Sequence, residues 1–340
     1  MTCDRSHRAF YLLLFSFPLI FCCRQSLAQS GTEAASFLDI PVGGRPAALG
    51  SSYSALASDA YAPIWNPAGL GFLPSTQLAG MHLSYLETIS NEFASFVHPL
   101  SPGHSIGVAA QYLSPGKSKG TDINGIPTGD FSGHYGAYSL AYGQTVGDRV
   151  SVGITGKIIE AKINDVSAQA YGFDAGAMFE ANRQVRLAAV VANVGTKLTF
   201  LEQGDSLPGN FRLGGLYSPA EYVNLTAEGV YGFTGLFSAH TGVEVMPSKL
   251  ISIRAGFRSD TLKELPGLSG FTTGIGLHFW EQEFDYAWVP LGDLGDTQYF
   301  SLVLRFGGGV DSKNIQTHQS VSRKGAKRPA DEDEVTPERL

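Results

Sequence analysis

The chain has 340 residues, of which only 16% are charged, whereas 41 are glycine and 11% are aromatic. Its formal net charge of −7 and the lack of a basic patch argue against a nucleic-acid-binding protein. Low charge with many glycines and aromatic residues is unusual for a soluble enzyme of this length, and it is typical of a β-sheet that faces lipid on one side.

Residues 1–28 have the three parts of a secretory signal peptide. Arg5 and Arg8 form a basic start, an apolar run of 15 residues follows from Ala9 to Cys23, and Ser26-Leu27-Ala28 places small residues before a cleavage point. A membrane anchor, which is the alternative interpretation, would need about 20 apolar residues. We therefore expect export through this signal peptide and cleavage after Ala28.

Residues 29–74 are rich in alanine and end at Trp65-Asn66-Pro67-Ala68-Gly69-Leu70. We predict short helical pieces and turns here. An Asn before Pro favours an extended or turn conformation, and Gly permits positive φ. Two interpretations remain open: a plain turn into the first strand, or a buried turn whose Asn66 hydrogen-bonds strand ends.

Residues 75–306 alternate between apolar and polar or mixed positions, as β-strands with two different faces do. We predict fourteen strands, separated by turn residues such as Ser101-Pro102-Gly103. The predicted strands are 75–86, 89–100, 103–113, 133–146, 149–161, 166–180, 183–194, 209–218, 220–231, 236–246, 249–258, 268–280, 282–290 and 297–306. One long loop, residues 114–132, is expected between the third and fourth of them.

The two faces of these strands predict which side meets lipid. Leu225 and Ile253 lie on apolar faces, whereas Arg254 lies on a mixed face that suits a polar lumen. We expect arginine at either apolar position to cost about 2–4 kcal/mol, and serine at Arg254 to cost little. A soluble β-sandwich would also alternate, but its charges would decorate the outside. Aromatic residues near strand ends would form interfacial girdles: Tyr85, Phe96, Tyr112, Tyr138, Tyr142, Tyr217, Tyr231, Phe257 and Trp288.

The last predicted strand carries Phe300, Leu302, Leu304 and Phe306 on one face, and we expect it to close the barrel. Residues 307–340 begin with three glycines and then become polar, with a basic block before an acidic one. Having almost no apolar residue to bury, this tail is predicted to be disordered on the periplasmic side.

We expect no catalytic, cofactor or metal site. All three cysteines lie at positions 3, 22 and 23, inside the predicted signal peptide. The histidines are scattered singly, and the glycine runs lack the lysine and flanking elements of a phosphate loop. The chain also has no Gly-x-Ser-x-Gly nucleophile motif, so an enzyme is not expected.

Two stretches together resemble the PorV/PorQ family of outer-membrane proteins, which belongs with the FadL-like barrels. The first contains Gly43-Gly44-Arg45, Leu49-Gly50, Ala55-Leu56-Ala57 and Asp59, and it closes on Trp65-Asn66-Pro67-Ala68-Gly69-Leu70. The second contains Arg254-Ala255-Gly256-Phe257-Arg258, Asp285-Tyr286-Ala287, Gly292-Asp293-Leu294-Gly295 and Ser301-Leu302. The chain departs from the family at Pro46-Ala47-Ala48, at Ser58-Asp59, and in its long tail.

The resemblance implies an all-β fold: a transmembrane, antiparallel, up-and-down β-barrel of about fourteen strands in the outer membrane, with an N-terminal hatch in its lumen. The implied hatch motif is Arg45, Asp59, Trp65, Asn66, Pro67 and Gly69. The organisation expected is therefore signal peptide (1–28), hatch (29–74), barrel (75–306) and tail (307–340).

The family also suggests what the barrel does. The first hypothesis is a component or adaptor of type IX-like protein secretion or surface attachment, with secreted cargo or a translocon as partners. The alternative is a FadL-like passive transporter of hydrophobic small molecules, and a third interpretation is a purely structural barrel. A large apolar pocket between hatch and wall would favour the transporter, and long ordered extracellular loops would favour the adaptor.

Overall fold

The structure is a computed structural model that describes residues 33–85, 88–261, 269–292 and 295–307. The predicted signal peptide (1–28) and all of the predicted tail beyond residue 307 lie outside the described residues. In the part of the chain that is described, no helix is both long and apolar enough to cross a bilayer.

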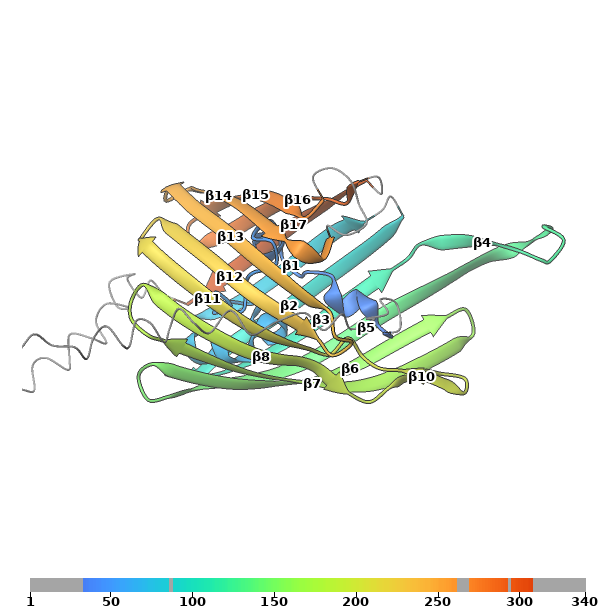
Figure 1. The fold of residues 1–340 in the computed structure, drawn as a ribbon, viewed down its shortest axis with the longest axis horizontal. Helices are drawn as coiled ribbons and strands as arrows, with labels where there is room; N and C mark the ends of the chain where they lie inside the picture. Colours follow the sequence, from blue (N-terminus) through green and yellow to red (C-terminus); the bar gives the residue numbers. More distant parts are fainter. Residues whose placement is uncertain (1–32, 86–87, 262–268, 293–294, 308–340) are drawn as a thin grey trace, which may run out of the picture.

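A closed β-barrel of fourteen antiparallel strands forms the body of the described molecule (Figure 1). Each strand pairs with the strands before and after it, β3 pairs with β5, and the first and last strands complete the ring. The strands are β1 (Thr76–Tyr85), β2 (Ile89–Ser101), β3 (His104–Ser114), β5 (Pro127–Val146), β6 (Val150–Ile163), β7 (Val166–Glu180), β8 (Val185–Gly195), β11 (Asn210–Ala220), β12 (Val223–Gly232), β13 (Phe237–Ser248), β14 (Ile251–Arg258), β15 (Phe271–Phe279), β16 (Gln282–Pro290) and β17 (Asp296–Phe306). The prediction of a fourteen-stranded antiparallel barrel is confirmed.

Side chains alternate between the outside and the inside of the barrel, as the period of two requires. Ile251 and Ile253 are exposed on the exterior, whereas Ser252 and Arg254 between them are buried. Leu225 is likewise on the exterior, with 37% of its surface exposed. Six of the predicted girdle residues are exposed there too: Phe96, Tyr112, Tyr138, Tyr142, Tyr217 and Tyr231. The predicted facing is therefore confirmed, and the exterior is an apolar surface that suits lipid.

Three short strands were not predicted from the sequence. β4 (Lys117–Thr121) pairs with the first part of β5, and the two form a hairpin that extends beyond the barrel wall (Figure 1). This hairpin occupies the region expected to be a loop, and it escaped prediction because β4 is polar on both faces. β9 (Leu198–Phe200) and β10 (Gln203–Asp205) form a separate small sheet between β8 and β11, and each is too short to show a period.

Residues 33–73, which we call the hatch, lie inside the barrel (Figure 1). The hatch contains η2 (Ser36–Asp39), α2 (Gly44–Ala48), α3 (Ala62–Trp65) and η3 (Pro67–Phe72). A further short helix, η4 (Ser259–Thr261), follows β14. Helix α2 packs against β14 to β17, whereas η3 packs against β3, β5, β6 and β7 on the other side of the lumen. The predicted short helical pieces are present.

The hydrophobic core lies between the hatch and the wall rather than within either of them. Leu49, Tyr53 and Leu70 of the hatch pack in one cluster with wall residues such as Leu83 and Phe93. This contact is close because the wall is glycine-rich where the hatch meets it. A Cβ added at Gly153 would lie 2.3 Å from the Pro67 carbonyl, and one at Gly256 would lie 2.1 Å from the Gly50 nitrogen.

Candidate functional site

The hatch motif predicted around Trp65 holds the hatch folded on itself. Asn66 is completely buried; its Oδ1 accepts a hydrogen bond from the Ala68 nitrogen at 3.0 Å, and its Nδ2 donates to the Ser54 carbonyl at 3.0 Å. Of the two open interpretations, the buried turn is the one observed, but its proposed bonds to strand ends are wrong, because both bonds stay within the hatch. Asn66 instead caps η3, where an Asx side chain satisfies a free backbone N–H.

The neighbours of Asn66 contribute to the same folded turn. Pro67 is the first residue of η3, where its missing N–H costs no hydrogen bond. Gly69 is needed for space, because a Cβ there would lie 1.4 Å from the Ala57 carbonyl oxygen. Trp65 Nε1 donates to the Val42 carbonyl at 2.9 Å, which connects the end of α3 to the start of the hatch.

Arg45 and Asp59, the two charged residues of the predicted hatch motif, lie near each other, with Arg45 Nη1 4.0 Å from Asp59 Oδ2. Asp59 also accepts hydrogen bonds from the Tyr53 hydroxyl and, at 2.9 Å, from the Tyr61 backbone nitrogen. Burial raises the pKa of the Asp59 carboxyl above its usual value, although Arg45 and the Tyr53 hydroxyl act in the opposite direction. Asp59 thus organises the middle of the hatch.

Arg45 also connects the hatch to the wall through a bidentate ion pair with Glu244 of β13. Arg45 Nε lies 2.9 Å from Glu244 Oε1, and Nη2 lies 2.7 Å from Oε2. Such fork-to-fork pairing fixes geometry as well as contributing energy. Glu244 also contacts Arg254 at 2.7 Å, so the pair continues into the wall.

A chain of charged side chains extends from Glu244 of β13 to β17, passing over β15, which contributes no member. Arg254 of β14 contacts Glu283 of β16 at 2.8 Å and hydrogen-bonds Asp285 of the same strand. Arg305 of β17 then contacts Glu283 at 2.8 Å. The Arg254 side chain has no exposed surface. Buried charges of this kind persist only when all partners are present, because an isolated one is strongly disfavoured by desolvation.

Neutral side chains of the wall hydrogen-bond the hatch backbone at several other points. Ser301 Oγ accepts from the Gly44 nitrogen at 2.9 Å, and Thr272 Oγ1 accepts from the Gly50 nitrogen at 3.0 Å. Thr155 Oγ1 donates to the Pro63 carbonyl at 2.9 Å. The barrel wall is therefore complementary to this one segment of its own chain.

The residues predicted to mark the closing strand lie apart from the lumen. Phe300, Leu302 and Phe306 are exposed on the outer face of β17, and Leu304 is partly exposed on the same face. β17 pairs with β1 from Thr76 opposite Phe306 to Ser84 opposite Gln298. These apolar residues belong to the exposed outer surface of the barrel.

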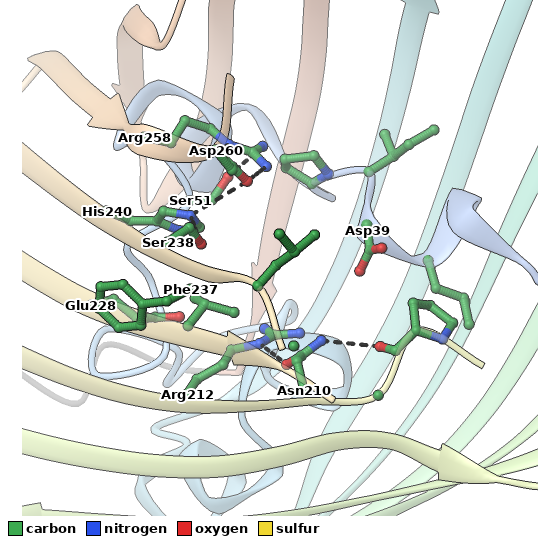
Figure 2. Close-up of a pocket in the computed structure, with 18 of the residues that line it drawn as sticks. Asp39, Ser51, Asn210, Arg212, Glu228, Phe237, Ser238, His240, Arg258 and Asp260 are labelled. Atoms are coloured by element: carbon green, nitrogen blue, oxygen red, sulfur yellow. Dashed lines mark hydrogen bonds and ion pairs between the residues drawn. The ribbon is translucent and has the colours of Figure 1, made fainter. Parts of the chain in front are cut away.

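A cavity of about 260 Å³ lies between the hatch and the ends of β11 to β14. Figure 2 shows that Asp39 of the hatch lies on one side of this cavity, whereas Glu228, Phe237 and His240 of the wall lie on the other. β12 runs in the same direction as β1, so the cavity near the end of β12 is at the mouth of the barrel opposite Thr76 and Phe306.

The cavity has an apolar part and a polar part. Ile64 and Trp65 of the hatch line it together with Val230, Leu236 and Phe237 of the wall. Its charged lining residues are Glu33, Asp39, Arg212, Glu228, Arg258 and Asp260, with His240 beside them. The alternation of the strands places Glu228 and Arg258 on the inner faces, but nothing in the sequence indicated that these side chains share a cavity.

Asp39 is exposed to the cavity, but the surrounding wall and hatch limit its access to water. This environment raises the pKa of the Asp39 carboxyl to about 6, and nearby Arg212 opposes the shift. Among the described residues, no cluster of three or more His, Cys, Asp or Glu side chains is arranged to bind a metal ion.

Several solved structures share this fold. The toluene transporter TodX of Pseudomonas putida matches with a TM-score of 0.53 and 13% identity, over 76% of this chain and 95% of that one. The CymD monoaromatic hydrocarbon channel matches with a TM-score of 0.55 and 12% identity, over 79% and 98%. A FadL homologue of Pseudomonas aeruginosa matches with a TM-score of 0.52 and 13% identity, over 77% and 97%. These identities establish likeness of fold alone.

A search of curated proteins found no match. A family model does match residues 24–200, which is more than half of the chain. Neither this model nor the three structures named above carries the PorV/PorQ name. The FadL-like part of the sequence-based resemblance is confirmed at the level of fold, and the chain belongs to the Uncharacterised protein family UPF0164.

Proposed function

We propose that this protein is an outer-membrane channel that passes small molecules, and that its hatch gates the lumen. The observation that carries the proposal is the cavity between hatch and wall at one mouth of a closed barrel. The exterior of the barrel wall is apolar, as contact with lipid requires. The similar folds of a toluene transporter and a monoaromatic hydrocarbon channel support the transport hypothesis.

The orientation follows from the number of strands. An even number puts Thr76 and Phe306 at the same end of the barrel, and short turns and termini lie on the periplasmic side of such barrels. The cavity then faces the cell exterior, and the β4–β5 hairpin extends from that same end. Solutes would enter at the cavity, and passage would require the hatch to shift.

The first hypothesis from the sequence, a role in protein secretion or surface attachment, has weaker support. The β4–β5 hairpin is the kind of long ordered loop expected of an adaptor, and Ile123 at its tip is 100% exposed. The family match and the three structures named above add nothing in favour of secretion. The hairpin therefore makes the adaptor a second candidate function. If the channel hypothesis is correct, deletion of the β4–β5 hairpin should leave solute uptake unchanged.

An engineered cross-link between hatch and wall tests the gate. A Cβ at Gly44 would lie 3.0 Å from Ser301 Oγ, which is close to the separation between a Cβ and the far sulfur of a disulfide. The same Cβ would lie 3.0 Å from Asp285 Cβ, so β16 must yield slightly, and the double variant Gly44→Cys, Ser301→Cys should then form a disulfide. The predicted mature chain has no other cysteine.

The measurement is uptake of the hydrophobic dye 1-N-phenylnaphthylamine by cells that produce the protein in their outer membrane. We expect uptake by wild type, little uptake by the oxidised double variant, and recovery of uptake after reduction. Each single-cysteine variant is a matched control and should behave as wild type. Equal uptake before and after reduction would show that the hatch does not gate, and no uptake by wild type would contradict the channel hypothesis.

A further inference from the structure

We infer that the cavity at the outer mouth binds an organic cation, a small solute with an ammonium group and an apolar body. This inference deepens the proposed channel function and rests on it for the route of the solute. It starts from two buried polar atoms of the wall that have no partner among the described residues.

Glu228 is the first of these groups, with only 4% of its surface exposed. Its Oε2 accepts hydrogen bonds from the Ser54 backbone nitrogen at 2.9 Å and from Ser54 Oγ at 2.6 Å. Its Oε1 lacks a partner among the described residues. Because no described cation pairs with this carboxylate, its negative charge lies uncompensated beside the cavity and favours a positively charged ligand there.

His240 is the second group, with 5% of its surface exposed. Its Nε2 is the ring nitrogen with polar neighbours. This atom lies 3.1 Å from Ser238 Oγ and 3.7 Å from Asp260 Oδ2. Nδ1 has no partner among the described residues. Two buried polar atoms of the cavity lining, Glu228 Oε1 and His240 Nδ1, therefore lack a partner in the described part of the chain.

The charges around the cavity favour a cation over an anion. Arg258 and Asp260 form a close pair, with distances of 2.9 and 2.6 Å, and largely neutralise each other. Of the other charged residues that line the cavity, Glu33, Asp39 and Glu228 are acidic, whereas Arg212 is basic. An excess of negative charge in a confined site attracts cations.

Arg212, the cation that remains, is already engaged. Its Nε donates to Asn210 Oδ1 at 2.8 Å, and its guanidinium lies 5.5 Å from the centre of the Trp65 ring. Asp39 on the opposite side of the cavity has no hydrogen bond or ion pair among the described residues, and it is exposed to the cavity (Figure 2). Asp39 is thus the group most available to a ligand ammonium.

The size and the apolar lining define the rest of the ligand. At about 260 Å³, the cavity is larger than the roughly 150 Å³ that accommodates benzene in an engineered protein cavity. Ile64, Leu236 and Phe237 provide apolar contacts. A phenyl ring with a short ammonium arm, as in 2-phenylethylammonium, matches both the volume and the division between apolar and acidic lining.

Calorimetric titration of the purified full-length protein in a neutral detergent tests the inference. The three probes have nearly the same shape and differ in charge: 2-phenylethylammonium, 2-phenylethanol and 3-phenylpropionate. We expect the ammonium to bind most tightly and the carboxylate least. Asp39→Asn should weaken ammonium binding by at least about tenfold, since a charged hydrogen bond is lost, and should change phenylethanol binding little. Arg212→Gln should strengthen ammonium binding.

Asp165→Asn in an exposed turn is the matched control and should leave all three affinities unchanged. Fast migration on unheated gels verifies that each variant is folded. Tighter binding of the carboxylate than of the ammonium would overturn the inference, as would equal ammonium affinity in Asp39→Asn and wild type, or no binding of any probe. Since the titration measures binding in detergent and the dye assay measures uptake by cells, failure of the ligand class and failure of the channel function are separate outcomes.

Discussion

Arg45 of the hatch and Glu244 of β13 are 199 positions apart in the chain, and their side chains meet in a two-pronged ion pair of 2.9 and 2.7 Å. This contact joins the hatch, which lies inside the lumen, to the closed wall of the barrel. Glu244 is almost fully buried and has a second arginine, Arg254, as partner. The hatch is therefore attached to the wall through Glu244, whose ion pair with Arg254 does not depend on Arg45.

Replacing Arg45 with Met should release the hatch while leaving the barrel closed. Glu244 keeps Arg254, so the loss should be smaller than the about 3–5 kcal/mol typical of a fully broken buried pair. We expect residues 33–73 to become susceptible to added protease and dye uptake to rise. Arg45→Lys, which keeps the charge but not the fork, should lie between Met and wild type. An intact, protease-resistant hatch in Arg45→Met would show that this pair does not hold it.

Replacing Arg254 with Ser should be strongly destabilising, contrary to the expectation drawn from the sequence. That expectation assumed a watery lumen, whereas the structure buries Arg254 among Glu244, Glu283 and Asp285. Removing it leaves three carboxylates near one another, and we expect a cost of about 3–5 kcal/mol or more. Urea titration of the refolded barrel in lipid measures this, with Ser252→Ala on the same inner face as the control. A cost below about 1 kcal/mol would mean that the carboxylates find other partners.

The barrel was predictable because each strand carries its own signal. Alternation in segments such as 249–258 assigns both the strand and its outer face, and the observed β14 differs by only two residues at its start. The closing pair, β1 with β17, follows from the same logic, because a barrel leaves no strand edge unpaired. β4 lacked this signal, since a hairpin that leaves the wall has water on both faces.

The site was not predictable, because its parts come from segments far apart in the chain. Asp39 and Glu228 line one cavity, but a single sequence contains no periodic signal that relates them. The hatch motif gave Arg45 and Asp59 as important residues without giving Glu244 as a partner. A charged residue on the inner face of a strand indicates only a polar interior, and its partner depends on the curvature of the barrel and on the path of the hatch.

Arginine at Leu225 should destabilise the barrel by about 2–4 kcal/mol if this residue lies near the middle of the bilayer. Leu225 is exposed on the outer face, where a charge would be transferred from water into lipid. Ile123→Arg at the tip of the β4–β5 hairpin is the control and should cost nothing measurable, since Ile123 is fully exposed beyond the barrel wall. Equal stability of the two variants in a urea titration in lipid would show that the outer face does not meet lipid.

Assembly should depend on the last strand rather than on the residues that follow it. Phe306 is half exposed on the outer face and pairs with Thr76, so Phe306→Asp would place a charge at the seam of the barrel. We expect less heat-modifiable protein in outer-membrane fractions from this variant, and an unchanged amount after truncation beyond Gly307. Loss of assembly on truncation, combined with normal assembly of Phe306→Asp, would contradict the assignment of β17 as the closing strand.

The raised pKa of Asp39 predicts how the stability of the folded protein varies with pH. The surrounding wall and hatch limit the access of Asp39 to water and raise this pKa to about 6; Glu33 and Asp260 add to the shift, whereas Arg212 and Arg258 oppose it. Glu228 and His240 face the same cavity. In the unfolded chain an aspartate titrates near about 3.9, so between these values the folded state holds more protons. The contribution of Asp39 to stability is therefore fully present below about pH 4 and is lost as pH rises through about 6.

Asp39→Asn removes this titration without removing a hydrogen bond or ion pair between described residues. We expect the variant to gain stability relative to wild type as pH rises from about 4 to about 6, and to show little further change from 6 to 8. The measurement is the temperature at which the fast-migrating folded band disappears, taken for both proteins across this range without added ligand. Asp165→Asn, in a turn outside the lumen, should show no such trend. A difference between Asp39→Asn and wild type that stays constant from pH 4 to 8 would mean that Asp39 titrates at the same pH in the folded and unfolded states, and that the cavity does not shield it.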